Sequence, residues 1–286
     1  MKKALQSLVL LLAALMVPAT ATATGYVRGD VNGDGIVGMD DLTALINYLV
    51  YGNDINMTGA DADLSGGVGM DDLTALINYL VFGVWPGNSH EWVDLGLPSG
   101  TLWATCNVGA DSPEDYGDYF AWGETETKEV HYLSTYKWCN GSRTTMTKYC
   151  TSSSYGYNGF VDNKTELDLE DDAAYVNWGA SWRMPNEEQQ VELIENCIKT
   201  WTTRNGVNGY LFTGPNGNTL FLPAAGYRYD SSLYDAGSYG YYWSRTLNSD
   251  YPFKAYNVFF LSEVVYLSDN NRDNGFAVRP VRVLQN

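Results

Sequence analysis

The chain has 286 residues, of which 45% are hydrophobic and 14% aromatic, and its formal net charge is −17. This composition is that of a globular protein long enough for one small and one medium-sized domain. The charge argues against nucleic acid and against anionic membrane surfaces as partners, since both call for a basic footprint.

The N-terminal residues are typical of a secretory signal peptide. Lys2 and Lys3 precede the apolar run Leu8–Val17, and the small residues at 19–23 fit a cleavage site. The run is too short for a membrane anchor, which needs about 20 apolar residues. No cysteine stands at the cleavage point to carry a lipid anchor. We therefore expect residues 1–23 to be removed and the mature protein to be secreted, periplasmic or at the cell surface, with no membrane span.

A repeat follows the signal peptide. Residues Met39–Gly52 recur as Met70–Gly83, shifted by 31 residues and with one substitution. Within each copy the apolar residues follow a helical period. Each predicted helix is too short to be stable alone in water, so we expect the two to pack against each other.

A loop rich in Asp and Gly precedes each predicted helix. Both loops, Asp30–Asp41 and Asp61–Asp72, place oxygen-bearing side chains at positions 1, 3, 5 and 12 and a glycine at position 6. Calcium prefers this arrangement, with a backbone carbonyl at position 7. The predicted ligands are Asp30, Asn32, Asp34, Ile36 (carbonyl) and Asp41 in the first loop, and Asp61, Asp63, Ser65, Gly67 (carbonyl) and Asp72 in the second.

The charge of this segment supports a bound cation. Between Asp30 and Gly83 there are nine aspartates and no Lys, Arg or His. Such a segment is either disordered or neutralised by a cation. The alternative is a pair of Asp/Gly turns without metal, but two loops in the same register favour two calcium ions. Ser65 is neutral where the first loop has Asp34, so we expect the second site to be weaker.

The duplicated loop–helix units, with no helix expected before either loop, resemble the dockerin module of cellulose-degrading assemblies. The resemblance covers about residues 30–83, inside a first domain expected at 24–83. It implies a small all-α module that folds with calcium and binds a cohesin domain. The family's recognition positions are here Met39-Asp40 and Met70-Asp71, which differ from the common Ser/Thr pairs. Another protein partner is therefore the alternative.

A turn-rich connector at 84–90 leads to a second domain at 91–286. Asn186, with Gln189 three residues later, predicts a helix that begins with a capping box. Ser112-Pro113 predicts a second, shorter helix start. Alternating and β-branched residues predict strands at 220–222, 241–244, 258–261 and 276–283.

Several motifs of this second domain resemble the Fibrobacter succinogenes major paralogous domain. They lie at 91–110, 118–124, Trp182-Arg-Met-Pro185, 221–228, Gly240-Tyr-Tyr-Trp-Ser-Arg245 and Gly275-Phe-Ala-Val-Arg-Pro-Val281. The family occurs in secreted proteins of Bacteroidetes and Fibrobacteres. The resemblance implies a mixed α+β, C-type-lectin-like domain in which the first and last strands pair.

The sequence contains four cysteines: Cys106, Cys139, Cys150 and Cys197. In an exported protein they allow two disulfides with three connectivities. The alternative is that some are small buried hydrophobic residues.

Three classes of function compete: a binding or adhesion protein, an accessory component of a polysaccharide-degrading assembly, and an enzyme. The sequence contains no GxSxG, HExxH or phosphate-loop motif, so we expect no catalysis. Residues 229–274 are rich in Tyr, Ser, Asp and Asn, a composition typical of binding surfaces. We expect irregular positions there to project from loops and bind a glycan or a protein, and the alternative is ordinary β-turns. The candidates are Tyr234, Tyr239, Asp250, Tyr251, Tyr256, Asn270 and Asn271.

Overall fold

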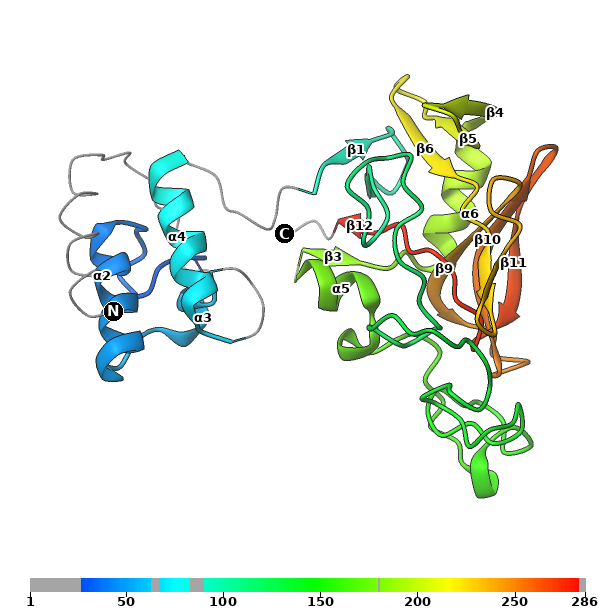
Figure 1. Ribbon diagram of the computed structural model, residues 1–286, viewed down its shortest axis with the longest axis horizontal. Helices are drawn as coiled ribbons and strands as arrows, with labels where there is room; N and C mark the ends of the chain where they lie inside the picture. Colours follow the sequence, from blue (N-terminus) through cyan, green and yellow to red (C-terminus); the bar gives the residue numbers. More distant parts are fainter. Residues whose placement is uncertain (1–26, 63–66, 83–89, 180, 283–286) are drawn as a thin grey trace. The chain divides into compact units, whose positions relative to one another are not determined.

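The computed structural model describes residues 27–62, 67–82, 90–179 and 181–282. Contacts between residues divide the chain into two compact units, Met1–Ser89 and His90–Asn286 (Figure 1). The predicted signal peptide and residues 84–89 of the predicted connector lie outside the described residues. Among the helices that are described, none is long and apolar enough to cross a membrane.

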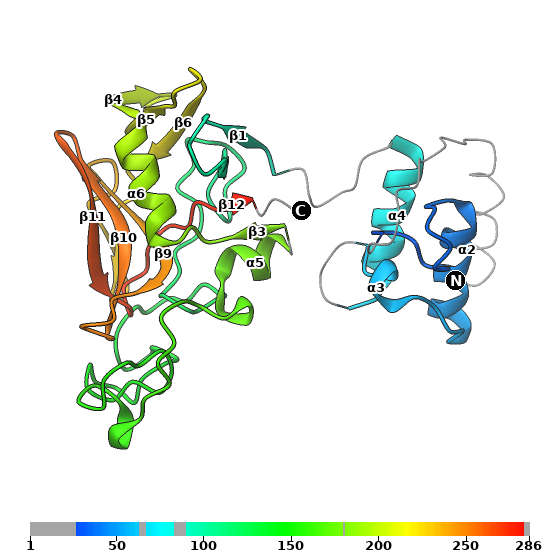
Figure 2. The same ribbon diagram turned by 180° about the vertical axis from the view of Figure 1, so that it is seen from behind.

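The first unit contains α2 (Met39–Tyr51), α3 (Met57–Ala60) and α4 (Met70–Phe82) in its described part. The predicted helices at Met39 and Met70 are thus confirmed. Figures 1 and 2 show α2 and α4 side by side, and their leucines share one buried core. Gly52 follows α2 with a φ of 74°, the left-handed conformation in which glycine ends helices.

The short helix α3 was not expected, because its sequence is polar and Gly-rich. Its partners come from the first loop instead. Gly29 N–H donates to the Gly59 carbonyl at 2.8 Å, and the Asn56 amide donates to the Asp30 carbonyl at 2.9 Å. A Cβ at Gly59 would collide with the Asp30 carbonyl. The prediction that no helix precedes the second loop is therefore wrong, since non-local hydrogen bonds hold this turn in place.

The second unit is a mixed α+β domain, as predicted, with four small antiparallel sheets. Three sheets have three or more strands, and the fourth is a hairpin. The four-stranded sheet has the order β1 (Trp92–Asp94), β2 (Leu102–Ala104), β12 (Val281–Arg282), β3 (Trp182–Arg183). The two three-stranded sheets have the orders β11 (Val264–Asn271), β10 (Lys254–Leu261), β9 (Tyr239–Leu247) and β4 (Ile198–Arg204), β5 (Val207–Thr213), β6 (Thr219–Pro223). The hairpin consists of β7 (Tyr227–Tyr229) and β8 (Ser232–Tyr234).

Three of the four predicted strands lie within β6, β9 and β10 and are confirmed. In the predicted strand 276–283, only Val281–Arg282 are strand among the described residues. β12 pairs with β2 and β3 rather than with β1. The expected direct pairing of the first and last strands is therefore wrong. β1 and β2 form an antiparallel pair, and only the far edge of β2 remains for β12.

The helices of the second unit are α5 (Ala173–Trp178), α6 (Glu187–Asn196) and the 3₁₀ turns η1 (Tyr157–Gly159) and η2 (Leu169–Asp171). The predicted capping box of α6 is confirmed, with Asn186 and Gln189 exchanging hydrogen bonds at 2.8 and 3.0 Å. The predicted helix at Ser112 is wrong. Asp115 N–H bonds back to the Ser112 carbonyl at 3.1 Å, so the segment closes as a turn.

The core of the second unit lies on both sides of the sheet formed by β9, β10 and β11. α6 packs against β9, β10 and β11 (Figures 1 and 2). Its Leu193 belongs to the same buried cluster as Val258 and Phe260. A second cluster contains the buried Trp122 and Trp243. Both clusters bring together segments far apart in the chain, so each position in this unit depends on distant residues.

Candidate functional sites

The first Asp/Gly loop is closed by its own backbone N–H groups. The Asp30 carboxylate accepts hydrogen bonds from the N–H groups of Gly33, Asp34 and Gly35 at 2.8, 3.0 and 3.0 Å. Gly35 has a φ of 85°, which confirms the sharp turn predicted at position 6. The predicted first ligand thus lies inside a tight turn, where its orientation is fixed.

Asp41, at the last loop position, lies against the start of the same loop. Its Oδ1 accepts from the N–H groups of Val31 and Asn32 at 2.7 and 3.0 Å, and its Oδ2 from Gly38 at 2.8 Å. Asp41 is fully buried, and this burial raises the pKa of its carboxyl despite the three hydrogen bonds. Because Asp41 is in the first turn of α2, it joins the two ends of the loop to the helix.

The other predicted ligands of this loop lie near its exposed side. The Asn32 amide donates to Asp34 and to Asp40, both at 2.9 Å. Hydrogen bonds from the Ile36 N–H and from Asn32 lower the pKa of Asp34, so this carboxylate stays charged. Asp40 is an additional acidic group at the loop that the ligand pattern did not include.

The second loop is described only in part. Asp63 and Ser65 lie outside the described residues, whereas Asp61, Gly67 and Asp72 are inside. Asp72 is buried, and its Oδ2 accepts from the Gly69 N–H at 2.7 Å, as Asp41 accepts from Gly38. The helix-entry ends of the two loops are therefore built alike.

The donor set of the first loop fits calcium. Its side-chain ligands are oxygen atoms only, and two of its carboxylates, Asp30 and Asp41, are buried. The sequence from Asp30 to Gly83 offers no cationic side chain to neutralise them. Hard cations such as calcium bind sets of carboxylate and carbonyl oxygens of this kind.

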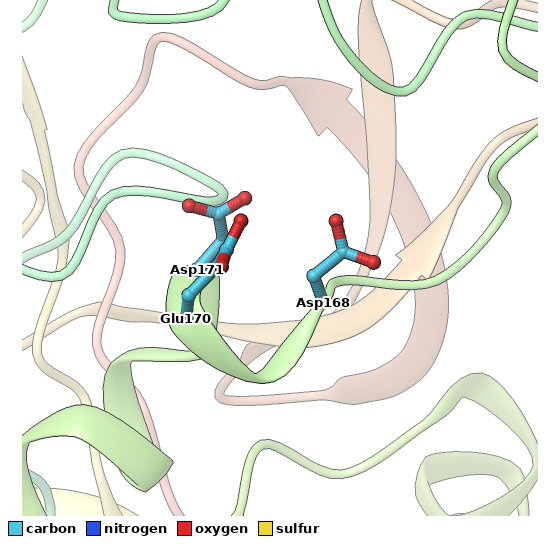
Figure 3. A group of neighbouring side chains, drawn as sticks. All are labelled: Asp168, Glu170 and Asp171. Atoms are coloured by element: carbon cyan, nitrogen blue, oxygen red, sulfur yellow. The ribbon is translucent and has the colours of Figure 1, made fainter. Parts of the chain in front are cut away.

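Another acidic group lies in the second unit, on and beside η2. Asp168, Glu170 and Asp171 bring one carboxylate oxygen each to within 4.8 Å of one another (Figure 3). Lys148 Nζ lies 2.8, 3.2 and 2.6 Å from these carboxylates, and Lys164 lies 2.6 Å from Asp168. Burial disfavours the charged lysine, but the three carboxylates outweigh it and raise the pKa of Lys148. The protein's own lysines therefore occupy the place of a cation here.

The structure does not gather the seven predicted ligand-binding residues on one surface. Tyr239 pairs with Leu261 at one end of β10, whereas Tyr256 lies five residues earlier on the same strand. Five residues of strand span roughly 17 Å, and an odd offset points the side chains to opposite faces. Asn270 is further occupied by a hydrogen bond to the buried Asn257 at 3.0 Å.

The expectation that these residues project from loops is wrong for most of them. Asp250 and Tyr251 lie in the connection between β9 and β10, but the others lie in strands: Tyr234, Tyr239, Tyr256, Asn270 and Asn271. The polar composition of the region was misleading. β11 is an edge strand, on which polar side chains are tolerated because one side faces water.

One of the predicted tyrosines belongs to a row of aromatic rings, and a second one contacts it. The row consists of Tyr234, Tyr227, Tyr241, Phe259 and Tyr266, with successive ring centroids 5.5, 5.1, 4.9 and 5.1 Å apart. Tyr239 contacts it at Phe259, at 5.8 Å. We call these five residues the aromatic row.

The aromatic row crosses the sheet on the face away from α6. Tyr241, Phe259 and Tyr266 are direct neighbours on β9, β10 and β11. Phe260, the next residue on β10, points the other way into the core under α6. Tyr234 and Tyr266 at the two ends are 42% and 48% exposed, and the three rings between them are half-buried, so the row is accessible mainly at its ends. The sequence signal for it is aromatic residues at alternate strand positions.

All four cysteines, which lie within the described residues, are free thiols. Cys150 and Cys197 are buried, and burial raises the pKa of Cys197 to about 11. The structure therefore favours the expectation of buried apolar residues over that of two disulfides.

Comparison with known protein families finds one match in each of the two units. Residues 28–81 match the family model of the Dockerin type I domain, and residues 173–281 match that of a domain of unknown function, DUF8237. No curated protein and no solved structure matches the chain. Nothing in these results bears on the resemblance to the Fibrobacter succinogenes major paralogous domain or to C-type lectins, which stay predictions. The predicted dockerin-like segment is confirmed, and Dockerin type I domains bind calcium.

Proposed function

We propose that this chain is an exported, non-catalytic binding protein whose first unit docks to a cohesin-type protein partner when calcium is bound. The observation that carries the proposal is the position of Asp41, which joins both ends of the first loop to α2. A calcium ion bound by the loop carboxylates would thereby fix the helix that follows. Dockerin modules occur in extracellular proteins, which agrees with export.

The proposed docking surface includes the first residues of α2 and α4. Met70 is 56% exposed, whereas the equivalent Met39 is half-buried and packs against the core of the unit. Asp40, beside Met39, bonds to Asn32 of the loop. The two copies of the repeat therefore offer different surfaces, and we expect the copy with the exposed methionine to contact the partner.

Surface plasmon resonance against a panel of purified cohesin domains tests this proposal. We expect the full mature chain to bind at least one of them in calcium and to lose that binding in EDTA. Met70→Ala should weaken the complex more than Met39→Ala does. A calcium-loaded chain that binds no cohesin would leave another protein as the partner. Binding that survives EDTA would overturn calcium-dependent docking altogether.

For the second unit we propose that the aromatic row binds a glycan. Aromatic rings offer flat, rigid contact area to the C–H faces of sugars, and tyrosine hydroxyls add hydrogen bonds at the edge. Successive rings whose centroids lie 4.9–5.5 Å apart suit a ligand that is itself a chain of rings. A protein ligand is the alternative. Together with docking, glycan binding would make the chain an accessory component of a polysaccharide-degrading assembly.

A glycan array with the full mature chain tests this second function. Tyr266→Ala and Tyr234→Ala should each weaken binding to any glycan found. Tyr251→Ala is the matched control, because Tyr251 is exposed but lies outside the aromatic row. Equal loss in all three variants would place the ligand elsewhere. Mass spectrometry of the glycan after incubation with the protein tests for catalysis, and shortened glycan products would overturn the non-catalytic assignment.

A further inference from the structure

The second unit contains a cavity of about 510 Å³ lined by polar and charged residues. This volume lies within the range of about 300–1,000 Å³ typical of small-molecule sites. Three arginines line it: Arg183 of β3, Arg245 of β9 and Arg282 of β12. The lining also includes two acidic residues, Glu166 and Asp172. The lining thus contains more arginines than carboxylates, whereas the chain as a whole has a net charge of −17.

Backbone pairing fixes the cavity wall around Arg245. Its N–H donates to the Pro185 carbonyl at 2.8 Å, and its carbonyl accepts from the Leu167 N–H at 3.1 Å. Its Nε donates to Glu166 at 3.1 Å and its Nη1 to the Met184 carbonyl at 3.0 Å. Among the described residues, its Nη2 group has no such partner. One edge of this guanidinium is therefore held in place while the other can meet a ligand.

Arg183 lies close enough to Arg245 for the two charges to act on each other. Burial lowers the pKa of Arg183, the charge of Asp172 opposes this, and the charge of Arg245 lowers the pKa again. The Arg183 guanidinium also lies over the ring of Tyr175, 4.3 Å from its centroid, which fixes its plane. An anion between the two arginines would relieve their repulsion.

The carboxylates in the lining fill this role only in part, since the pKa of Arg183 stays below its usual value despite the charge of Asp172. Asp172 is buried and caps α5, and it accepts hydrogen bonds from the N–H groups of Ala174, Tyr175 and Met184. Among the described residues, Glu166 forms an ion pair with Arg245 alone, and its side chain is 46% exposed to solvent. An exposed pair of this kind contributes little and can be displaced.

The lining also carries hydroxyl and amide groups. The Gln189 amide donates to the Thr101 hydroxyl at 3.2 Å, and Thr101 in turn bonds to Ser99 at 2.6 Å. Leu167 and Val281 add apolar surface to the lining, next to Arg245 and Arg183, with which their backbones pair. Such a lining can bond to ligand hydroxyls and pack against C–H groups at the same time.

We propose that this cavity binds an acidic sugar, with its carboxylate between Arg183 and Arg245 and its hydroxyls toward Thr101 and Gln189. Guanidinium groups match a carboxylate in a two-point geometry that few other side chains provide. The proposal shares with the proposed function only the premise that a glycan is the ligand. The cavity residues do not belong to the aromatic row, so either site can be wrong without the other.

Calorimetric titration of the full mature chain in calcium tests the site with three probes: galacturonate, galactose and acetate. Galactose lacks the carboxylate, and acetate lacks the sugar. We expect galacturonate to bind at least tenfold more tightly than either. Galactose binding as tightly as galacturonate would overturn the role of the arginines. Acetate binding as tightly would reduce the site to a simple anion pocket and overturn the sugar.

Variants locate the site. Arg245→Gln should weaken galacturonate at least tenfold, and Arg204→Gln is the matched control, since Arg204 pairs with Glu114 away from the cavity. If Arg245→Gln fails to fold, the salt dependence of the parent decides. Affinity must then fall between low and high salt, because a charge pair is screened, and an unchanged affinity overturns the proposal. The glycan array described above reports on the aromatic row, and the galacturonate titration reports on the cavity, so failure of one proposal can be told from failure of the other.

Discussion

Among the described charged residues, those buried in the first unit are all carboxylates, whereas the second unit buries guanidinium groups as well as carboxylates. The first unit buries carboxylates, Asp30, Asp41 and Asp72, in a segment that has no cationic residue between Asp30 and Gly83. The second unit buries guanidinium groups, with Arg272 fully buried and Arg279 only 1% exposed. A buried charge is costly unless hydrogen bonds or an opposite charge compensate it. The difference lies in where each unit obtains that compensation.

The second unit provides it from its own backbone. Arg272 donates to the carbonyls of Lys148, Tyr149 and Pro252 and to the Tyr136 hydroxyl. Arg279 donates in the same way to three carbonyls and to Asn107. Burial lowers the pKa of Arg279 to about 10, which still leaves it charged at neutral pH. The segment Asp30–Gly83 of the first unit has backbone N–H groups but no cationic side chain, so we propose that its stability depends on an ion from solution.

Removal of calcium is expected to have the largest effect, and to destabilise the first unit but not the second. In EDTA the first unit should lose most of its helix, since each bound ion adds about 3 kcal/mol when free calcium is a hundredfold above its Kd. Thermal unfolding of the full mature chain, followed by far-UV circular dichroism, should show one transition that moves with calcium and one that does not. Two transitions that are both insensitive to EDTA would contradict the calcium requirement.

Arg272→Ala should be the most damaging single change in the second unit. It removes the donor from three carbonyls and a hydroxyl in the interior, and each unsatisfied buried group costs about 1–3 kcal/mol. We expect the calcium-insensitive transition to lose at least about 3 kcal/mol in urea unfolding. Arg204→Ala, at an exposed arginine, is the control and should change little. A small loss in Arg272→Ala would show that water replaces the guanidinium.

Acid should weaken the second unit through His131. This side chain is fully buried, and burial, with the charges of Lys128 and Arg228, lowers its pKa from 6.5 to about 4. Between pH 6.5 and about 4, His131 is protonated in the unfolded chain but neutral in the folded unit. The free energy of unfolding therefore falls as the pH drops from about 6.5 to about 4. The loss is at most about 3 kcal/mol.

Urea unfolding of the parent and of His131→Gln across this pH range measures the effect. Carboxylates titrate in the same window, so only the difference in slope between the two proteins counts. His90 stays in both, and its lowered pKa therefore cancels. Equal slopes would mean that His131 becomes accessible to water before it is protonated.

The sequence predicted more of the first unit than of the second because its signals are local. The repeat, the loop positions and the glycine turns lie within a few residues of the elements they define. α3 is the exception, since it depends on contacts between Gly59 and the distant Asp30. In the second unit β11 was not predicted: Val264–Leu267 favour a strand, but its polar half, Ser268–Asn271, is a strand only because it pairs with β10.

The sites of the second unit were harder still to predict. Arg183 and Arg245 are 62 positions apart in the numbering and meet only through β3 and β9. The predicted tyrosines were selected by composition, which does not tell the two faces of a strand apart. Register does, and it placed Tyr256 on the face opposite Tyr241 and Phe259. A prediction of these surfaces needs strand pairing, which the sequence of one chain does not contain.

The smallest expected effect compares the two loops with each other. Position 5 is Asp34 in the first loop and Ser65 in the second, and the remaining side-chain ligands differ only at position 3. The hydrogen bonds that lower the pKa of Asp34 keep it charged and available to a cation. Asp34→Ser should weaken calcium at the first site by roughly tenfold, since ligand charge tunes affinity in such loops. Ser65→Asp should tighten the second site in the reciprocal way. Calcium titrations of the parent, both single variants and the double swap, monitored by calorimetry, separate the two sites. If the double swap restores the parent's pair of affinities with the loops exchanged, position 5 accounts for the difference. If Asp34→Ser leaves both affinities unchanged, Asp34 is no calcium ligand and the weaker second site needs another cause.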